Sequence, residues 1–185
     1  MAGLVMLDRD GVINADSPGY IRSPTQWEPI PGSLEAISRL NRSGFDVVVC
    51  TNQSGIARGL LSEDDLAAIH ARMREAVRDA GGDLRGVFVC PHAPEDGCFC
   101  RKPAPGLLHQ VARRLGRPVL GAWFIGDSER DLAAARAAGA RPVLVRTGNG
   151  AETEASGGAG DAIVFADLAN AAEALIARSL ESAGG

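Results

Sequence analysis

Two acidic residues, Asp8 and Asp10, come directly after the apolar run 4–7. A short run of this kind predicts a strand buried on both faces, as in a parallel sheet. Residues two apart on an extended chain point to the same side, so we expect both carboxylates together at the carboxyl end of that strand. A divalent cation such as Mg²⁺ would relieve the repulsion between them. The alternative is a turn in which one acid caps the next segment and Gly11 provides the bend.

A second strand is predicted for the β-branched segment 45–50. Four polar residues follow it directly: Thr51, Asn52, Gln53 and Ser54. A hydroxyl group and backbone N–H groups at the end of a strand can hold a phosphate. These residues are therefore candidates for binding a phosphorylated ligand, while capping of the next helix is the alternative.

Asp127 occupies a similar position, because it follows the apolar segment 121–125, which predicts a further buried strand. The carboxylate of Asp127 could complete an oxygen cage for Mg²⁺ together with that of Asp8. Capping of the helix predicted at 129–138 is the alternative.

Three thiols and one imidazole lie within eleven residues: Cys90, His92, Cys98 and Cys100. Soft thiolates and imidazole suit tetrahedral Zn²⁺, and four protein ligands leave no open position. The segment 90–100 therefore predicts a structural zinc loop, with reduced, unligated cysteines as the alternative. Arg101 and Lys102 follow at once, and Lys102 is the only lysine among 19 basic residues. A zinc loop would determine where these two cations point.

The rest of the chain alternates apolar strand-like segments with amphipathic helical segments, a pattern typical of α/β proteins. Further strands are predicted at 86–89, 142–145 and 162–165, and further helices at 33–44, 62–80, 104–115 and 167–178. His70, on the second of these helices, is expected to be a surface or satisfied histidine rather than a metal ligand.

Three segments lack regular periodicity. Segment 12–31 predicts a long loop at the carboxyl edge of the sheet, where Asp16, Gly19 and Tyr20 could reach a substrate or simply belong to a surface loop. Segment 150–160 is rich in Gly and Ala and is expected to be a mobile loop, and residues 181–185 are expected to fray.

Composition limits the possible functions. The chain has 185 residues, 45% of them apolar and 23% charged, so we expect one domain, 1–185, with a sizeable core. The net charge of −4 and the scattered basic residues argue against binding to nucleic acid or to an anionic membrane surface. No secretory or membrane-spanning segment is present, so we expect a cytoplasmic protein, a monomer, without disulfides.

Taken in order, four motifs resemble those of the haloacid dehalogenase superfamily of phosphohydrolases: Asp8-Arg9-Asp10-Gly11, Thr51-Asn52, Lys102, and Gly126-Asp127 with Asp131. The Cys/His loop before the lysine is similar to that of the histidinol-phosphate and heptose-bisphosphate phosphatases. Segments 51–59, 100–103 and 143–148 most resemble the heptose-bisphosphate enzymes. The resemblance implies a three-layer, Rossmann-like α/β sandwich with a mainly parallel sheet of about six strands and no cap domain.

The resemblance also implies a mechanism. Asp8 would attack phosphorus to form an aspartyl-phosphate, and Asp10 would protonate the leaving sugar oxygen and then activate water. Mg²⁺ would be held by Asp8, Asp127 and the backbone carbonyl of Asp10. Thr51 and Lys102 would hold the non-bridging phosphate oxygens.

The implied substrate is D-glycero-D-manno-heptose 1,7-bisphosphate, which would lose its 7-phosphate on the way to nucleotide-activated heptose for lipopolysaccharide or surface glycans. Arg58, Arg101 and Arg146 are candidates for its second phosphate. Ser128 stands at a position where some relatives have a basic residue. Arg130 could supply the missing positive charge.

Three other functions stay open at this point. The spacing of the Cys/His loop also resembles histidinol-phosphate phosphatases. A phosphoacceptor signalling domain is disfavoured, because it would need its acidic pair and its acceptor aspartate on different strands, whereas Asp8 and Asp10 lie two apart. The third is a zinc-stabilised binding module without catalysis.

Overall fold

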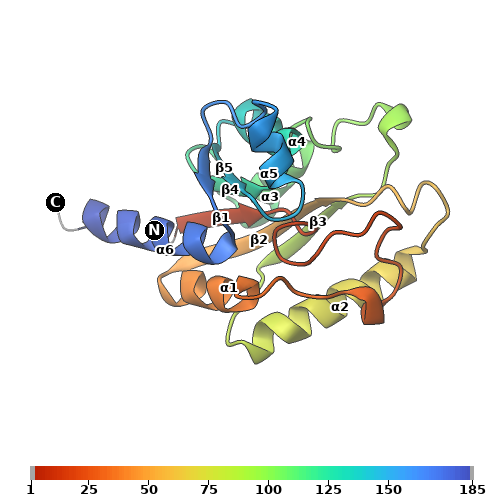
Figure 1. The fold of residues 1–185 in the computed structure, drawn as a ribbon, viewed down its shortest axis with the longest axis horizontal. Coiled ribbons are helices and arrows are strands. Elements are labelled where there is room, and N and C mark those ends of the chain that lie inside the picture. The colour runs from red at the N-terminus through yellow and green to blue at the C-terminus, as the bar shows by residue number, and fades with distance from the viewer. Residues whose placement is uncertain (1–2, 184–185) are drawn as a thin grey trace.

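Strands and helices alternate along the chain, and the strands pair into one sheet (Figure 1). The structure is a computed structural model and describes residues 3–183. The strands are β1 (Gly3–Leu7), β2 (Phe45–Asn52), β3 (Gly86–Cys90), β4 (Trp123–Gly126), β5 (Arg141–Val145) and β6 (Ile163–Phe165). Their order is β3-β2-β1-β4-β5-β6, and every pair is parallel. The predicted α/β class with a six-stranded parallel sheet is confirmed.

The first strand, β1, lies in the middle of the sheet between β2 and β4. Its apolar residues 4–7 are buried, as expected for a strand covered on both faces. Leu7 pairs with Val49 of β2 and with Ile125 of β4. This register brings the polar residues that follow the three strands to one edge of the sheet. Open parallel sheets bind their ligands at this edge.

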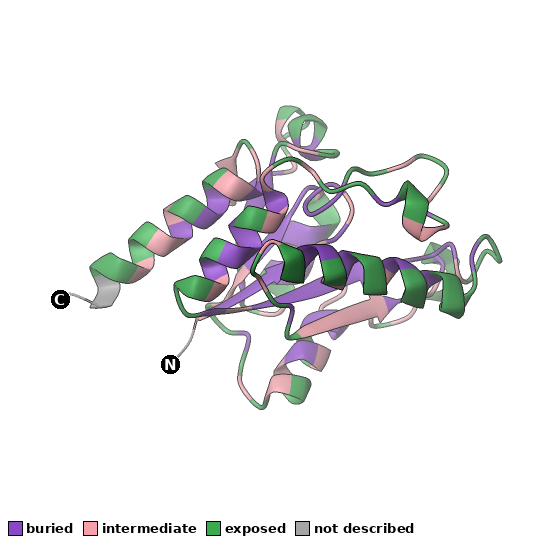
Figure 2. Ribbon diagram, turned by 90° about the horizontal axis from the view of Figure 1, so that it is seen from below, coloured by how far each residue is buried: buried purple, intermediate pink, exposed green. Residues whose placement is uncertain are grey.

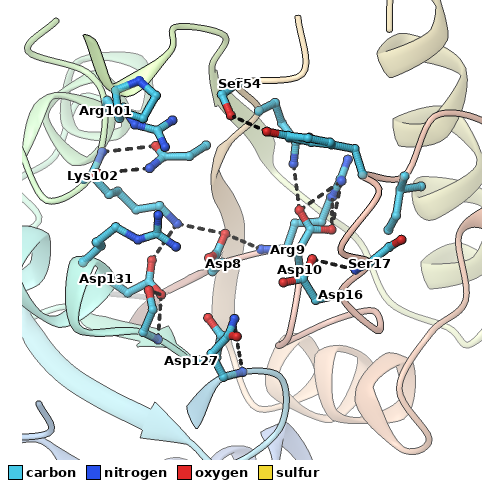
Figure 3. A pocket seen from close by; sticks show the side chains of 18 of the residues that line it. Asp8, Arg9, Asp10, Asp16, Ser17, Ser54, Arg101, Lys102, Asp127 and Asp131 are labelled. Carbon is cyan, nitrogen blue, oxygen red and sulfur yellow. Dashed lines mark hydrogen bonds and ion pairs between the residues drawn. The ribbon is translucent and has the colours of Figure 1, made fainter. Parts of the chain in front are cut away.

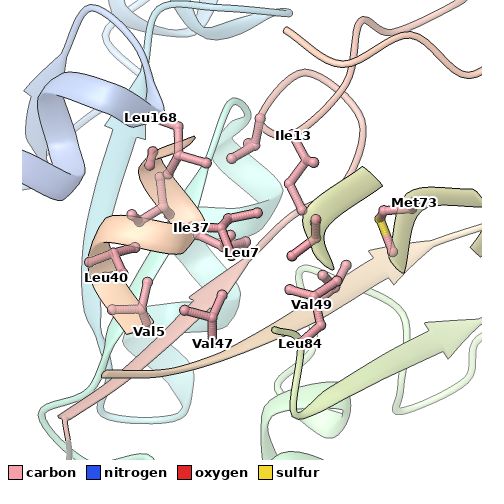
Figure 4. Packing of buried hydrophobic residues seen from close by; sticks show 14 of the residues in the cluster. Val5, Leu7, Ile13, Ile37, Leu40, Val47, Val49, Met73, Leu84 and Leu168 are labelled. Carbon is pink, nitrogen blue, oxygen red and sulfur yellow. The ribbon is translucent and has the colours of Figure 1, made fainter. Parts of the chain in front are cut away.

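Helices cover both faces of the sheet, because alternate strand residues point to opposite sides. On one face, Val5 and Val49 face α1 (Ser33–Arg42), α2 (Glu63–Asp79) and α6 (Leu168–Ala183), whose buried residues Ile37, Met73 and Leu168 complete this core (Figure 4). On the other face, α3 (Gly106–Leu115) and α4 (Glu129–Ala137) pack on the sheet. The helices bury their inner sides and expose their outer sides (Figure 2). The predicted three-layer sandwich is confirmed.

One local prediction was wrong. A helix, α5 (Gly150–Ala155), forms in the segment expected to be a loop, because the Thr153 hydroxyl docks it by donating to the backbone carbonyl of Asp127 at 3.0 Å. The last helix continues to Ala183, and fraying of the tail stays a prediction. Residues 184–185 lie outside the described part.

The connections after β1 and β2 contain no inserted domain within residues 3–183. Residues 8–32 form a loop with one short 3₁₀ turn, η1 (Pro24–Gln26), and residues 53–62 form the loop that precedes α2. Among the described residues, no helix has the length and apolar character needed to span a bilayer.

Candidate active site

A cavity of about 410 Å³ opens at the carboxyl ends of β1, β2 and β4 (Figure 3). Its lining includes most of the site residues singled out from the sequence: Asp8, Asp10, Asp16, Tyr20, Asn52, Gln53, Ser54, Arg58, Arg101, Lys102, Asp127, Ser128 and Arg130. Gly19, Thr51 and Arg146 do not line it.

Lys102 is buried beneath the cavity between two carboxylates (Figure 3). Its Nζ lies 2.8 Å from Asp8 Oδ1 and 2.6 Å from Asp131 Oδ1, and it donates to the carbonyl of Cys50 at 3.0 Å. Burial alone would lower the pKa of Lys102, but the charges of Asp131 and Asp8 raise it above its ordinary value. Lys102 is therefore a fixed cation beside Asp8.

Three carboxylates come together here, since one oxygen each from Asp8, Asp127 and Asp131 lies within 4.8 Å of the others. Burial raises the pKa of Asp8 well above its ordinary value and that of Asp127 to about 6, while Lys102 keeps the pKa of Asp131 low despite its burial. Lys102 supplies one positive charge against three negative ones. An all-oxygen set with excess negative charge fits Mg²⁺.

Asp127 is held in one orientation from the neighbouring strand. The backbone N–H and the side-chain amide of Asn149 donate to its Oδ2 at 2.8 and 3.0 Å. Gly11 and Gly148, at φ values of 78° and 58°, pack against the same oxygen, and a methyl group at either position would collide with it. This packing leaves Oδ1 as the oxygen free of the Asn149 hydrogen bonds.

The side chain of Asp10 is paired with an arginine. Asp10 Oδ1 accepts from Arg9 Nε at 3.0 Å and from Arg9 Nη2 at 2.9 Å, and Nη2 also reaches Oδ2 at 3.0 Å. Asn14 and Gln53 each donate a further hydrogen bond at 2.9 Å. Arg9 is thus a counter-ion of the Asp10 side chain, and relief of the repulsion between Asp8 and Asp10 by Mg²⁺ stays a prediction. Binding through the backbone carbonyl of Asp10 stays a prediction.

The polar residues after β2 have distinct surroundings. Thr51 is buried, and its hydroxyl oxygen accepts from Gln53 Nε2 at 2.9 Å. Asn52 is joined to the backbone of Lys102 by two hydrogen bonds of 3.1 Å, one to its carbonyl and one from its N–H. Asn52 thus holds the Lys102 segment against β2. Ser54 Oγ lies 3.5 Å from the Tyr20 hydroxyl across the cavity wall.

Of the three arginines predicted to bind a second phosphate, two line the cavity and one does not. Arg58 and Arg101 are lining residues, and Arg130 joins them. Arg146 instead forms two hydrogen bonds, of 2.6 and 2.8 Å, to the Glu154 carboxylate. Glu154 belongs to α5, which the sequence did not predict, so this competing partner was missed.

The Cys/His loop gathers its four side chains into one cluster. The Sγ atoms of Cys90, Cys98 and Cys100 are 3.3–3.6 Å apart, and His92 Nδ1 lies 3.2 Å from Cys100 Sγ and 3.6 Å from Cys90 Sγ. A tetrahedral site with Zn–S bonds of about 2.3 Å places its sulfurs about 3.8 Å apart. The cluster therefore fits a closed zinc site. Arg101 Nη1 donates to the His92 carbonyl at 3.1 Å, which connects this loop to the cavity.

Sequence reasoning placed Arg9 and Asp131 in motifs without naming their partners, and it named no role for Asn149. His70 was expected to be a surface or satisfied histidine, and it has Arg9 as a partner. Asn149 follows the strand predicted at 142–145, so the pattern used for Asp8 and Asp127 could have found it. The contact between Arg9 and His70 depends on where α2 packs on the sheet, and no sequence signal indicated it.

The sequence of this chain is similar to those of known phosphatases. Residues 99–171 match a family described as HAD-hydrolase-like. The chain is 51% identical, over 94% of its length and 97% of the relative's, to D-glycero-beta-D-manno-heptose-1,7-bisphosphate 7-phosphatase of Pseudomonas aeruginosa, and 49% identical, over 94% and 97%, to that of Bordetella bronchiseptica.

Solved structures give the same result. The D,D-heptose 1,7-bisphosphate phosphatase of B. bronchiseptica, complexed with magnesium and phosphate, matches with a TM-score of 0.92 and 48% identity, over 95% of this chain and 99% of that one. The enzyme of Burkholderia thailandensis matches with a TM-score of 0.74 and 40% identity, over 94% and 98%.

Proposed function

This chain belongs to the D-glycero-beta-D-manno-heptose-1,7-bisphosphate 7-phosphatase family of HAD-like hydrolases, and we propose that it removes the 7-phosphate of that heptose bisphosphate. The observation that carries the proposal is the position of Asp8, on the cavity floor with Lys102 Nζ at 2.8 Å and Asp127 and Asp131 beside it. This arrangement suits a carboxylate nucleophile next to a phosphate-binding cation.

In the first step, an Asp8 oxygen attacks phosphorus and the bond from phosphorus to the sugar oxygen breaks. Asp10 must carry a proton at the start of this step and gives it to the departing oxygen. In the second step, Asp10 takes a proton from water, the water oxygen attacks phosphorus, and the acyl-phosphate bond breaks to release phosphate and restore Asp8. Hydrogen bonds from Arg9, Asn14 and Gln53 orient the Asp10 carboxylate for both transfers.

Charge compensation is the main electrostatic requirement of these steps, because a carboxylate must approach a phosphate dianion. Mg²⁺ held by Asp8 and Asp127 would supply positive charge at this point. Lys102 supplies a second positive charge to the non-bridging oxygens, and its contacts with Asp131 and the Cys50 carbonyl keep its ammonium group in place. The Thr51 hydroxyl is assigned to a non-bridging oxygen by family resemblance.

The second phosphate requires cations away from Asp8. Arg58, Arg101 and Arg130 line the cavity, and forked guanidinium groups suit phosphate oxygens. The zinc loop supports this side of the site through the hydrogen bond from Arg101 to His92. A cytoplasmic location, a monomeric state, a single domain and the absence of nucleic-acid partners stay predictions.

The decisive experiment is phosphate release from the heptose bisphosphate with and without Mg²⁺, compared with histidinol phosphate. We expect the heptose substrate to be preferred at least tenfold in kcat/KM. Asp8→Asn should abolish turnover while the fold and zinc content persist. A preference for histidinol phosphate would assign the chain to the alternative reaction. Activity of the Asp8→Asn variant would show that Asp8 is not the nucleophile.

A further inference from the structure

Arg9 is an almost fully buried cation, 1% exposed, and all three of its guanidinium nitrogens have partners. Nε and Nη2 bind the Asp10 carboxylate. The remaining nitrogen, Nη1, lies 3.2 Å from His70 Nε2. Arg9 therefore links a histidine of α2 to the acid–base residue of the proposed mechanism.

His70 is the acceptor in this contact, because a guanidinium has only donors. Its ring must then be neutral, with the proton on Nδ1. Burial, with the nearby charge of Arg9, lowers the pKa of His70 to about 3, with Arg74 also lowering it and Asp10 opposing the shift. At neutral pH, His70 is thus a permanent acceptor for Arg9 Nη1.

The position of His70 separates it from the reacting atoms. It lies on α2, between Ile69 and Met73, which are buried against the sheet, and it does not line the cavity. An effect of His70 on the reaction would have to pass through Arg9. A guanidinium held at both ends has a fixed plane, and that plane sets the orientation of the carboxylate bound to it.

We propose that His70 is a positioning residue, which fixes the Arg9 guanidinium and thereby aims the Asp10 carboxylate at the leaving oxygen. This inference rests on the proposed function. It predicts a selective defect: proton delivery to a sugar oxygen suffers, while binding and the attack by Asp8 do not. Misplacement of a catalytic group by about 1 Å can cost on the order of 100-fold in rate.

The test compares kcat/KM for two substrates whose leaving groups differ in their need for a proton. This parameter reports the steps up to formation of the aspartyl-phosphate. The heptose bisphosphate has a sugar leaving group that needs a proton, whereas p-nitrophenyl phosphate has one that leaves without it. For His70→Leu, we expect kcat/KM to fall about tenfold or more on the heptose bisphosphate and less than about threefold on p-nitrophenyl phosphate.

Two amide variants make the test independent of general damage to the fold. His70→Gln places an oxygen near the position of Nε2 and should restore kcat/KM to within about threefold, whereas His70→Asn reaches only the position of Nδ1 and should not. If His70→Leu does not fold, this pair gives the same comparison. His109→Leu makes the same change on α3 outside the cavity, where the exposed ring lies near Phe99 of loop 90–100 rather than near Arg9, and it is a control for the loss of a histidine.

Equal losses on both substrates would reduce His70 to a structural residue and overturn the proposal. Equal activity of His70→Gln and His70→Asn, or an unchanged His70→Leu, would overturn it as well. A wild-type protein that hydrolyses p-nitrophenyl phosphate but not the heptose bisphosphate would instead refute the proposed substrate. The two failures can therefore be told apart.

Discussion

Asp127 should make the metal-free protein less stable as the pH rises, and Mg²⁺ should reverse the effect. The side chain of Asp127 is only 3% exposed, and burial, with a contribution from Asp131, raises its pKa from 3.8 to about 6. A group with a raised pKa in the folded state stabilises the fold fully below its unfolded pKa. This stabilisation is lost as the pH rises through the folded pKa.

The size of the effect follows from the two pKa values. A change from 3.8 to about 6 corresponds to about 3 kcal/mol of unfolding free energy, lost between about pH 4 and pH 7. For a chain of 185 residues, this corresponds to a decrease in Tm of about 6–12 °C. The raised pKa of Asp8 acts in the same direction.

Asp127→Asn is the matched control, because its amide oxygen can still accept from Asn149 while its charge is absent. Thermal unfolding of both proteins after removal of Mg²⁺, with zinc retained, should show the wild type losing stability relative to the variant from pH 4 to pH 7. At pH 7, added Mg²⁺ should raise the Tm of the wild type and leave that of Asp127→Asn nearly unchanged.

A stability difference between the two proteins that stays constant from pH 4 to pH 7, or that changes in the opposite direction, would refute this reasoning. An equal response of both proteins to Mg²⁺ would show that Asp127 does not hold the ion.

Two further predictions concern Lys102 and the zinc loop. Lys102→Met leaves Asp8 and Asp131 without their buried cation, so urea denaturation should show a loss of about 3–5 kcal/mol, and a loss below about 1 kcal/mol would contradict the role of the ion pairs. Removal of zinc with a strong chelator, followed by assay in excess Mg²⁺, should unfold loop 90–100 and release Arg101 from the His92 carbonyl, which raises KM for the bisphosphate; an unchanged KM in the zinc-free protein would contradict this prediction.

The features that the sequence predicted correctly depend on short stretches of chain. Segments 4–7 and 47–50 have the continuous apolar character of strands covered on both faces, and both became buried strands. The zinc ligands lie within eleven residues, so turns alone can bring them together. The segment 150–160 was misjudged, because its helix depends on docking against the end of β4 rather than on local preference.

The charge partners within the site were decided by tertiary structure. Lys102 lies between Asp8 and Asp131 only because β1, β2 and β4 align their carboxyl ends. Arg9 lies next to Asp10 in the sequence, but its second contact, with His70, comes from α2, which is distant in the sequence.

The sequence by itself determined the strands, the positions of the acids after them and the four zinc ligands, because periodicity and spacing are local properties. Only the tertiary structure decided that Arg9 neutralises Asp10, that Glu154 binds Arg146 outside the cavity, and that His70 contacts Arg9. A charged side chain pairs with whatever group the packing of distant elements places beside it, and spacing along the chain does not specify that neighbour.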